Sequence, residues 1–224
     1  MKKKYNMTIV ICVADDVRIA KMLESIYADL EIIVVLNGAT KEVKEIVQKY
    51  KINIIEIPEK NLSKARNIGI LNAKFDKVIF YDSDCIIMPK AIENYDKLLE
   101  KYLLVDGLVC FKKENFQSKI VGILREFGIP GYALCPSIGI NKKILEKIDG
   151  YFFDEDIKWI EDSELNIRAK KANVKVGFIK DITCIHDNLT FKQDLKSAFR
   201  YGASVKTAAK KGLHVKKPTA NWNL

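Results

Sequence analysis

Two aspartates stand two positions apart where an apolar segment of the sequence ends. Residues 78–81 are all apolar or aromatic, and Asp82, Ser83 and Asp84 follow them directly. Carboxylates with this spacing, on a turn that leaves a buried strand, can hold a divalent cation, and their hard oxygen atoms favour Mg²⁺ or Mn²⁺ bridged to a diphosphate. A solvated turn that caps the next helix would contain the same residues, so the pattern alone leaves both interpretations open.

A second acidic pair, Glu161 and Asp162, opens a predicted helix over residues 161–171. The helix dipole favours acidic residues in a first turn, and that effect alone could explain the pair. The preceding loop, residues 149–156, concentrates aromatic and acidic residues without the alternation of a strand. Such a composition is typical of a loop that lines a substrate site.

His186 is one of only two histidines in the chain. It follows the apolar residues 182–185, where a strand is expected to emerge, and Asp187 comes next. An imidazole at this place could act as a ligand or an acid-base group. A half-buried histidine at a sheet edge, with no chemical role, is the alternative interpretation.

Short apolar segments alternate with amphipathic segments through the first half of the chain. This alternation predicts a parallel, doubly wound sheet whose ligand crevice lies at the carboxyl ends of the strands, where Asp82 and Asp84 stand. Ser63 is the expected N-cap of the third helix. The predicted strands are residues 8–13, 31–36, 52–57 and 77–81, and the predicted helices are 17–28, 41–50 and 63–73.

The second half is less regular, but neither an internal repeat nor a Pro/Ser-rich linker divides it. A single domain with a basic C-terminal extension is therefore expected. The chain is predicted to break at residues 128–131, which contain two glycines and a proline. The predicted strands are residues 104–111, 138–141, 174–179 and 182–185, and the predicted helices are 91–101, 118–127, 142–148, 161–171 and 194–211.

The composition describes an ordinary globular protein, with 224 residues, 48% hydrophobic and 30% charged. Its net charge of +9 is concentrated at the ends, in residues 2–4 and in residues 191–224, where eight Lys or Arg face Asp194 alone. A nearly neutral body argues against a nucleic-acid-binding core. The basic ends favour contact with an anionic surface or a phosphate-bearing substrate.

The five cysteines contain no C-x-x-C pair. They therefore favour small buried side chains in a reducing compartment over disulfide bonds or metal ligands. The first residues contain no cleavage pattern of a secretory signal, and the sequence has no apolar run of membrane-spanning length. A cytoplasmic location is expected.

Taken together and in this order, the motifs resemble a family 2 glycosyltransferase of the GT-A fold, over about residues 7 to 205. The segments that carry the resemblance are residues 62–70, 78–84, 149–155, 161–168 and His186. The resemblance implies a Rossmann-like, mostly parallel central sheet with helices on both faces. It also implies a domain over residues 1–190, with a nucleotide-binding half at about 1–110 and an acceptor-side half at 111–190, followed by the basic helical extension 191–224.

The resemblance also implies a reaction and the residues that perform it. Such enzymes transfer a sugar from a nucleotide-diphosphate sugar with inversion at the anomeric carbon, here to a glycan or lipid-linked acceptor. Asp162 would be the general base, with Glu161 the next candidate. The metal ligands for Mn²⁺ or Mg²⁺ would be Asp84, His186 and Asp82, and the nucleotide-sugar would contact Asn37, Arg66, Asn67, Asp82 and Ser83.

Departures from the family pattern refine this expectation. The chain lacks a Q-x-x-R-W motif and membrane spans, which favours transfer of a single sugar over processive synthesis. Two alternatives remain: a non-catalytic GT-A protein that uses its basic tail on a membrane or nucleic acid, and a phosphatase resembling haloacid dehalogenases. The second would use Asp82 and Asp84 as nucleophile and acid, but that pair normally follows the first strand and precedes Thr or Val, whereas Cys85 follows here.

The C-terminal extension combines an apolar stripe with many lysines. The stripe is expected to pack on the domain, and Trp222 could anchor the chain at an interface. One interpretation is a docked helix with solvated lysines, and the other is peripheral contact with the anionic inner face of a membrane. The stripe consists of Leu195, Ala198, Phe199, Gly202, Val205 and Ala209.

Overall fold

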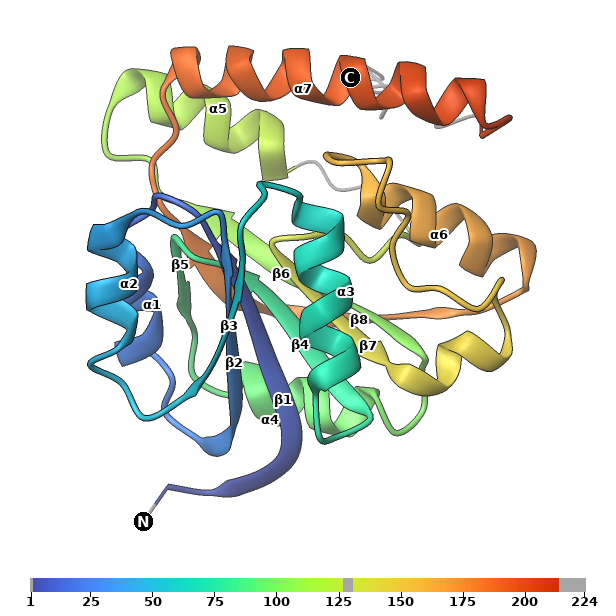
Figure 1. The fold of residues 1–224 in the computed structure, drawn as a ribbon, viewed down its shortest axis with the longest axis horizontal. Coiled ribbons are helices and arrows are strands. Elements are labelled where there is room, and N and C mark those ends of the chain that lie inside the picture. The colour runs from blue at the N-terminus through green and yellow to red at the C-terminus, as the bar shows by residue number, and fades with distance from the viewer. Residues whose placement is uncertain (1, 127–130, 214–224) are drawn as a thin grey trace.

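The computed structural model describes residues 2–126 and 131–213, which fold around one eight-stranded sheet (Figure 1). The strand order is β3-β2-β1-β4-β7-β6-β8-β5. The pairs β3–β2, β2–β1, β1–β4 and β6–β8 are parallel, whereas β7 and β5 run antiparallel to their neighbours. The strands are β1 (Lys4–Val13), β2 (Asp29–Asn37), β3 (Asn53–Ile57), β4 (Lys77–Asp82), β5 (Cys85–Ile87), β6 (Leu104–Phe111), β7 (Ser137–Asn141) and β8 (Val176–His186).

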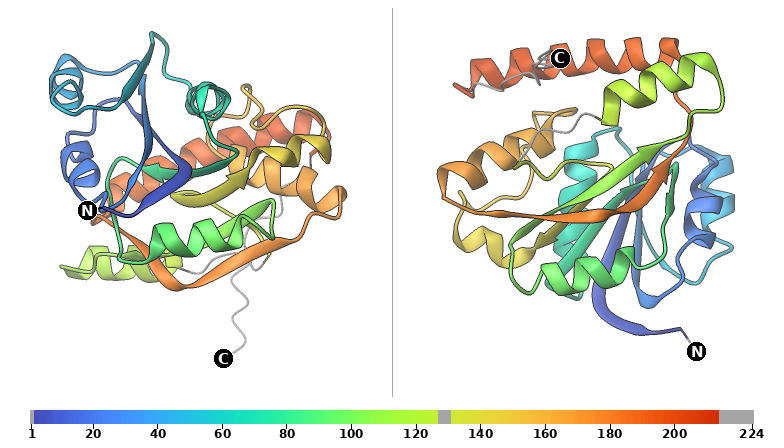
Figure 2. Two further views of the ribbon diagram at one scale, coloured as in Figure 1. Left: turned by 90° about the horizontal axis from the view of Figure 1, so that it is seen from below. Right: turned by 180° about the vertical axis from the view of Figure 1, so that it is seen from behind.

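Helices cover both faces of the sheet (Figure 2). Successive residues of a strand point to opposite faces, so Ile9 and Ile11 of β1 pack with α1, α2 and α4, and Val10 between them packs with α3 and α6. Gly69 lets α3 approach β1 closely, because a Cβ atom there would lie 2.3 Å from Val10 Cγ1. The helices are α1 (Ile19–Glu24), α2 (Lys41–Val47), α3 (Leu62–Asn72), α4 (Ala91–Leu98), α5 (Phe116–Glu126), the 3₁₀ helix η1 (Lys142–Glu146), α6 (Glu161–Lys171) and α7 (Phe191–Lys210).

Most predicted elements are confirmed within a few residues, but the connection after β4 is not. The short strand β5 was not expected, and it pairs antiparallel with β8. The strands predicted at 174–179 and 182–185 form the single strand β8, and the helix predicted at 142–148 is the 3₁₀ helix η1. Three residues of strand are too few to show a periodic pattern, so only pairing with a distant strand reveals β5.

The predicted N-cap of α3 is wrong. Asn61 caps this helix, because its side-chain oxygen accepts a hydrogen bond from the backbone N–H of Lys64 at 3.2 Å. Ser63 is fully buried instead, and its hydroxyl donates to the backbone oxygen of Ile157. Both residue types are good N-caps, so sequence preference alone could not distinguish them.

The predicted packing of the C-terminal stripe is partly wrong. Leu195 and Phe199 are 60% and 74% exposed, and α7 packs instead through Ser204 and Ala208, the second of which joins a small cluster with Ile157 and Ile160. Only the second half of α7 therefore meets the domain through buried side chains. Residues 127–130, which include most of the chain break predicted at 128–131, and residues 214–224, which include Trp222, lie outside the described residues.

Candidate active site

The residues predicted to bind a metal come together near the carboxyl ends of β4 and β8. Asp82 ends β4, Asp84 follows in the turn to β5, and pairing of β5 with β8 sets Cys85 opposite His186. One ligand atom from each of Asp82, Asp84 and His186 lies within 4.8 Å of the others. The unpredicted strand β5 thus brings together residues that are 102 positions apart in the sequence.

The hydrogen bonds of His186 fit a metal ligand. Its Nδ1 lies 2.9 Å from the backbone oxygen of Asp187, an arrangement in which Nδ1–H donates and Nε2 is left with a lone pair. This Nε2 is 3.2 Å from Asp84 Oδ1, which also carries a lone pair. Two facing lone pairs need a proton or a cation between them. The ring packs on Phe111, with centroids 4.7 Å apart, which fixes its orientation.

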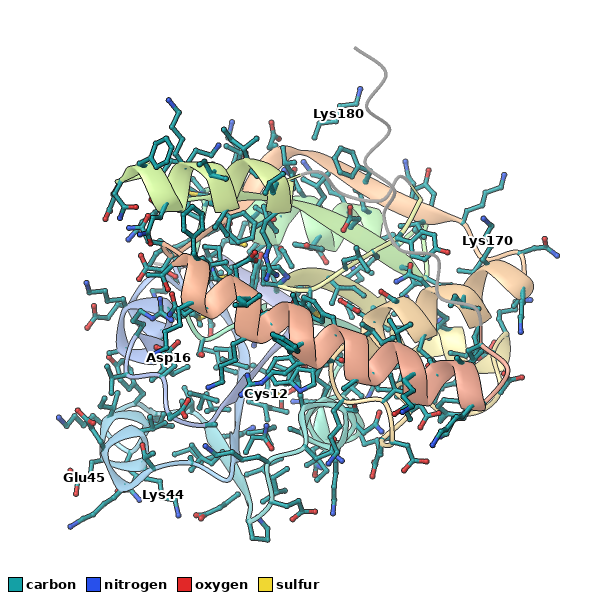
Figure 3. All side chains as sticks on the ribbon, turned by 90° about the horizontal axis from the view of Figure 1, so that it is seen from above. Cys12, Asp16, Lys44, Glu45, Lys170 and Lys180 are labelled. Atoms are coloured by element: carbon teal, nitrogen blue, oxygen red, sulfur yellow. The ribbon has the colours of Figure 1, made fainter. Side chains whose placement is uncertain are left out.

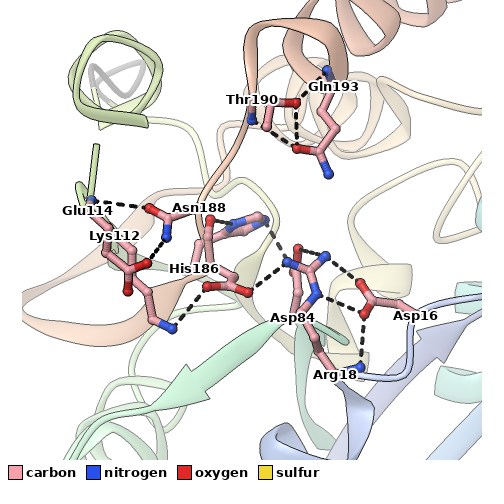
Figure 4. Close-up of polar contacts among 10 residues, drawn as sticks. Asp16, Arg18, Asp84, Lys112, Glu114, His186, Asn188, Thr190 and Gln193 are labelled. Carbon is pink, nitrogen blue, oxygen red and sulfur yellow. Dashed lines mark hydrogen bonds and ion pairs between the residues drawn. The ribbon is translucent and has the colours of Figure 1, made fainter. Parts of the chain in front are cut away.

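Arg18 is a site residue that the sequence analysis missed. From the N-terminus of α1 its guanidinium donates to Asp16, to Asp84 Oδ2 at 3.1 Å and to Asp187 Oδ2 at 2.9 Å (Figure 4). Burial raises the pKa of Asp84, while the charge of Arg18, and that of His186 when its ring is protonated, oppose that rise. Burial alone would raise the pKa of Asp187 as well. Hydrogen bonds from Arg18 and Lys112 outweigh this effect and hold its pKa below the usual value. The signal in the sequence that could have identified Arg18 was the charged turn that directly follows β1.

Arg66 connects this cluster to the start of α6. Its side chain is 4% exposed; Nη2 lies 3.3 Å from Asp82 Oδ1, and Nη1 forms an ion pair with Glu161. Glu161 is itself buried, and its Oε2 is a buried atom for which the described residues supply no hydrogen-bond partner. The buried guanidinium therefore balances carboxylates from two elements that are far apart in the sequence.

Asp162 and Asp106 form a second pair of carboxyl groups. Asp162 accepts hydrogen bonds from the backbone N–H groups of Cys135 at 3.0 Å and Ser163 at 2.6 Å, and burial, opposed by Arg66, raises its pKa. On β6, Asp106 accepts from the N–H of Leu134 at 3.1 Å. Burial, reinforced by the charge of Asp162, raises the pKa of Asp106 to about 7. Asp106 was not among the predicted site residues, although an acid within an apolar strand was a usable signal.

The remaining predicted site residues have protein partners of their own. At the end of β2, Asn37 Oδ1 accepts from the N–H of Asn61 at 2.8 Å. In α3, Asn67 donates to Phe153 O and Glu155 Oε1 and accepts from the N–H of Phe153. Ser83 is half-buried in the turn between the two aspartates. The structure therefore ties Asn67 to the loop before α6, rather than to the Asp82, Asp84 and His186 cluster.

Comparison with known proteins identifies the family of the chain. The model of the family Glycosyl transferase family 2 matches residues 8–134, more than half of the chain. The chain belongs to glycosyl transferase family 2. The match to this family includes Asp82 and Asp84, while Asp162 and His186 lie beyond it. An uncharacterized glycosyltransferase of Rickettsia bellii (strain RML369-C) is 22% identical over 187 residues; the match covers 77% of this chain, which spans only 27% of that relative.

Solved structures with similar folds include S. aureus TarS 1–349 in complex with UDP-GlcNAc, with a TM-score of 0.68 and 17% identity, covering 94% of this chain and 67% of that one. TarS 1–349 with UDP gives a TM-score of 0.62 at 16% identity, covering 89% and 65%. The mannosyltransferase PcManGT from Pyrobaculum calidifontis, in complex with GDP-Man and Mn²⁺, gives 0.68 at 17% identity, covering 95% and 66%. These likenesses confirm the predicted GT-A fold.

Proposed function

We propose that this family 2 protein transfers a single sugar from a nucleotide-diphosphate sugar to an acceptor hydroxyl, with inversion at the anomeric carbon. The observation that carries the proposal is one connected set of contacts, which runs from the His186 and Asp84 pair through Asp82 and Arg66 to the start of α6. Asp162 follows Glu161 at the start of α6, so it lies at the end of this set opposite the His186 and Asp84 pair. Inversion needs a base on the face of the sugar opposite the leaving group, and a separated carboxylate meets that need.

Asp84, His186 and Asp82 are proposed to hold Mn²⁺ or Mg²⁺. Two carboxylates and an imidazole within 4.8 Å form a ligand set suited to either ion. The facing lone pairs of His186 Nε2 and Asp84 Oδ1 support a cation between them. When bound, this cation would neutralise charge on the departing diphosphate.

Asp162 is proposed as the general base that accepts the proton of the acceptor hydroxyl. Two backbone N–H groups orient its carboxylate, and burial makes it more basic than an ordinary aspartate. Glu161 is the weaker candidate, because its side chain is only 3% exposed and is paired with Arg66. A protonated Asp106 beside an ionised Asp162 would leave the two carboxyl groups in different states near neutral pH.

Donor binding is proposed for Arg66, Asp82 and Ser83, with a narrower role for the two asparagines. The positive charge of Arg66 next to Asp82 supports a place near the nucleotide. Asn37 uses its oxygen on Asn61, so its amide Nδ2 is the group proposed to meet a ribose or base. Asn67 is proposed to position the loop that carries Glu155.

A glycan or a lipid-linked saccharide is the proposed acceptor, reached from the acceptor-side half, residues 111–190, while residues 1–110 take the nucleotide. Peripheral contact with the anionic inner face of a membrane, from a cytoplasmic location, would bring a lipid-linked acceptor within reach.

Membership in family 2 argues against the phosphatase alternative. No helix among residues 2–126 and 131–213 is long and apolar enough to cross a membrane.

Release of nucleoside diphosphate tests the proposed reaction. The chain would be incubated with UDP-, GDP- and dTDP-sugars, each with Mn²⁺, with Mg²⁺ or with a chelator. We expect one nucleotide class to be turned over and the chelator to abolish turnover. The anomeric configuration of the product, read by NMR, should be opposite to that of the donor. Turnover that a chelator leaves unchanged, or retention of configuration, would contradict the proposal.

A further inference from the structure

Exposed apolar side chains are concentrated on two helices. Of the thirteen exposed large hydrophobic residues found in the described part of the chain, six lie on α5 and α7. The most exposed of the thirteen are Phe116 on α5, at 76%, and Phe199 on α7, at 74%. We call this set the α5–α7 face; it consists of Phe116, Ile123, Leu124, Phe191, Leu195 and Phe199.

The two helices are fixed side by side on one face of the molecule (Figure 3). Arg125 of α5 donates to Asp194 of α7 at 2.7 and 2.8 Å and to the hydroxyl of Tyr201 at 3.0 Å. These bonds hold α5 and α7 together, so their exposed residues form a shared surface. An exposed apolar surface of this kind on a folded domain marks an interaction site.

Positive charge borders the apolar residues. On α7, Lys192 and Lys196 each follow one position after Phe191 and Leu195, so the lysine row runs along the helix about 100° around from the apolar row. This helix carries five Lys or Arg and one acid, Asp194, which Arg125 already neutralises. Apolar residues flanked by lysines are typical of a helix that lies in the plane of a membrane interface.

We propose that the α5–α7 face docks onto an anionic lipid leaflet, with its aromatic and aliphatic side chains among the headgroups and the lysines against lipid phosphates. The proposal rests on the peripheral membrane contact included in the proposed function, and it identifies the residues that would make that contact. Docking through the α5–α7 face differs from a contact made by the lysines at the C-terminal end of α7. Lys211 at that end is already paired with Asp154 and Asp156. A second copy of the chain is a poorer partner, since self-association would bring the two lysine rows together.

The position of the α5–α7 face fits this role. Only four residues separate His186 at the end of β8 from Phe191 at the start of α7. In Figure 1, α7 lies on the side of the molecule toward which β1 runs from the N-terminus. Docking through this surface would hold the candidate active site close to the lipid headgroups.

Co-sedimentation with vesicles tests the proposal. Neutral phosphatidylcholine vesicles would be compared with vesicles containing about 30% phosphatidylglycerol, at low and high salt. We expect the chain to partition onto the anionic vesicles at least tenfold better than onto the neutral ones, and less at high salt. Recovery of the protein in the supernatant with both lipids would overturn the proposal.

Two sets of variants locate the contact. Phe116→Ser, Leu124→Ser and Phe199→Ser together should lower partitioning at least tenfold, whereas Leu71→Ser, at a 65% exposed position of α3, should not. Lys192→Gln with Lys196→Gln should remove the preference for anionic lipid. The matched pair Lys21→Gln and Lys49→Gln, at exposed positions on another part of the surface, should keep it.

Two measurements keep the result independent of folding and catalysis. The melting temperature of the triple variant should equal that of the parent chain, because its three side chains are exposed. Its nucleoside diphosphate release without vesicles should also be unchanged, so loss of lipid binding with full turnover supports docking alone. Equal loss of lipid binding in Leu71→Ser would contradict the assigned face. Self-association that the triple substitution abolishes, without lipid binding by the parent, would assign this surface to a second copy instead.

Discussion

Asp106 offers a quantitative test of how the carboxyl groups near α6 share their protons. Burial raises its pKa to about 7, the charge of Asp162 adds to the rise, and the N–H of Leu134 opposes it. An ionised Asp162 makes ionisation of Asp106 less favourable, so we expect the two carboxyl groups to lose their protons in separate steps. The proposed base is expected to be ionised while Asp106 still carries its proton.

This shift has a definite effect on stability. An aspartate in an unfolded chain has a pKa of about 3.9, so between that value and about 7 the folded protein binds more protons than the unfolded one. Stability contributed by the protonated Asp106 is present below the lower value and is lost as pH rises through the upper one. Between pH 5 and pH 8 the loss is roughly 2 kcal/mol, after allowance for the solvent screening of a partly exposed carboxyl.

The substitution Asp106→Asn isolates this contribution. Asparagine keeps an oxygen for the N–H of Leu134 but cannot ionise. Urea unfolding at pH 5, 6, 7 and 8 should show the variant gaining roughly 2 kcal/mol over the parent chain as pH rises. Asp29→Asn, at an exposed position, serves as the control and should show no such gain. A difference between variant and parent that stays constant with pH would refute the reasoning.

Three further substitutions test other parts of the account. Asp162→Asn keeps the size of the side chain but removes the base, so turnover should fall by roughly 10²–10⁴ while donor affinity survives; full activity would move the base to Glu161. Arg18→Gln removes the guanidinium beside Asp84, so calorimetry should find Mn²⁺ bound about tenfold more tightly, and weaker binding would instead assign Arg18 to orienting the ligands. Asn61→Ala removes the cap of α3 and should cost about 1 kcal/mol in urea unfolding, whereas no change would mean that the cap is dispensable.

Local patterns in the sequence were sufficient to predict the strands β1 to β4 and the helices between them. Strands and helices of ordinary length, such as β2 and α2, leave a periodic signal in the residues that form them. The position of Asp82 at a strand end followed from that alternation. The same reasoning missed β5, which is three residues long and is defined by its pairing with β8.

The candidate site was only partly predictable for a related reason. Asp84 and His186 could be singled out by residue type, but their proximity depends on β5. Arg18 meets Asp84 across 66 positions of sequence, and nothing local in the chain reveals such an ion pair. Asp106 stood out as an acid in an apolar strand, yet its raised pKa arises from burial and from Asp162, which belongs to another element. Tertiary contacts, rather than local preference, set these properties.

Binding of Mn²⁺ together with a nucleoside diphosphate tests the central claim most directly, because it needs neither an acceptor nor turnover. Titration calorimetry would measure the affinity for the nucleotide identified in the donor panel, with and without Mn²⁺, in the parent chain and in Asp84→Ala. We expect Mn²⁺ to strengthen nucleotide binding in the parent, and we expect Asp84→Ala to lose that dependence while keeping its melting temperature. Nucleotide binding by Asp84→Ala with the Mn²⁺ dependence of the parent would contradict the assignment of Asp82, Asp84 and His186 as the metal site.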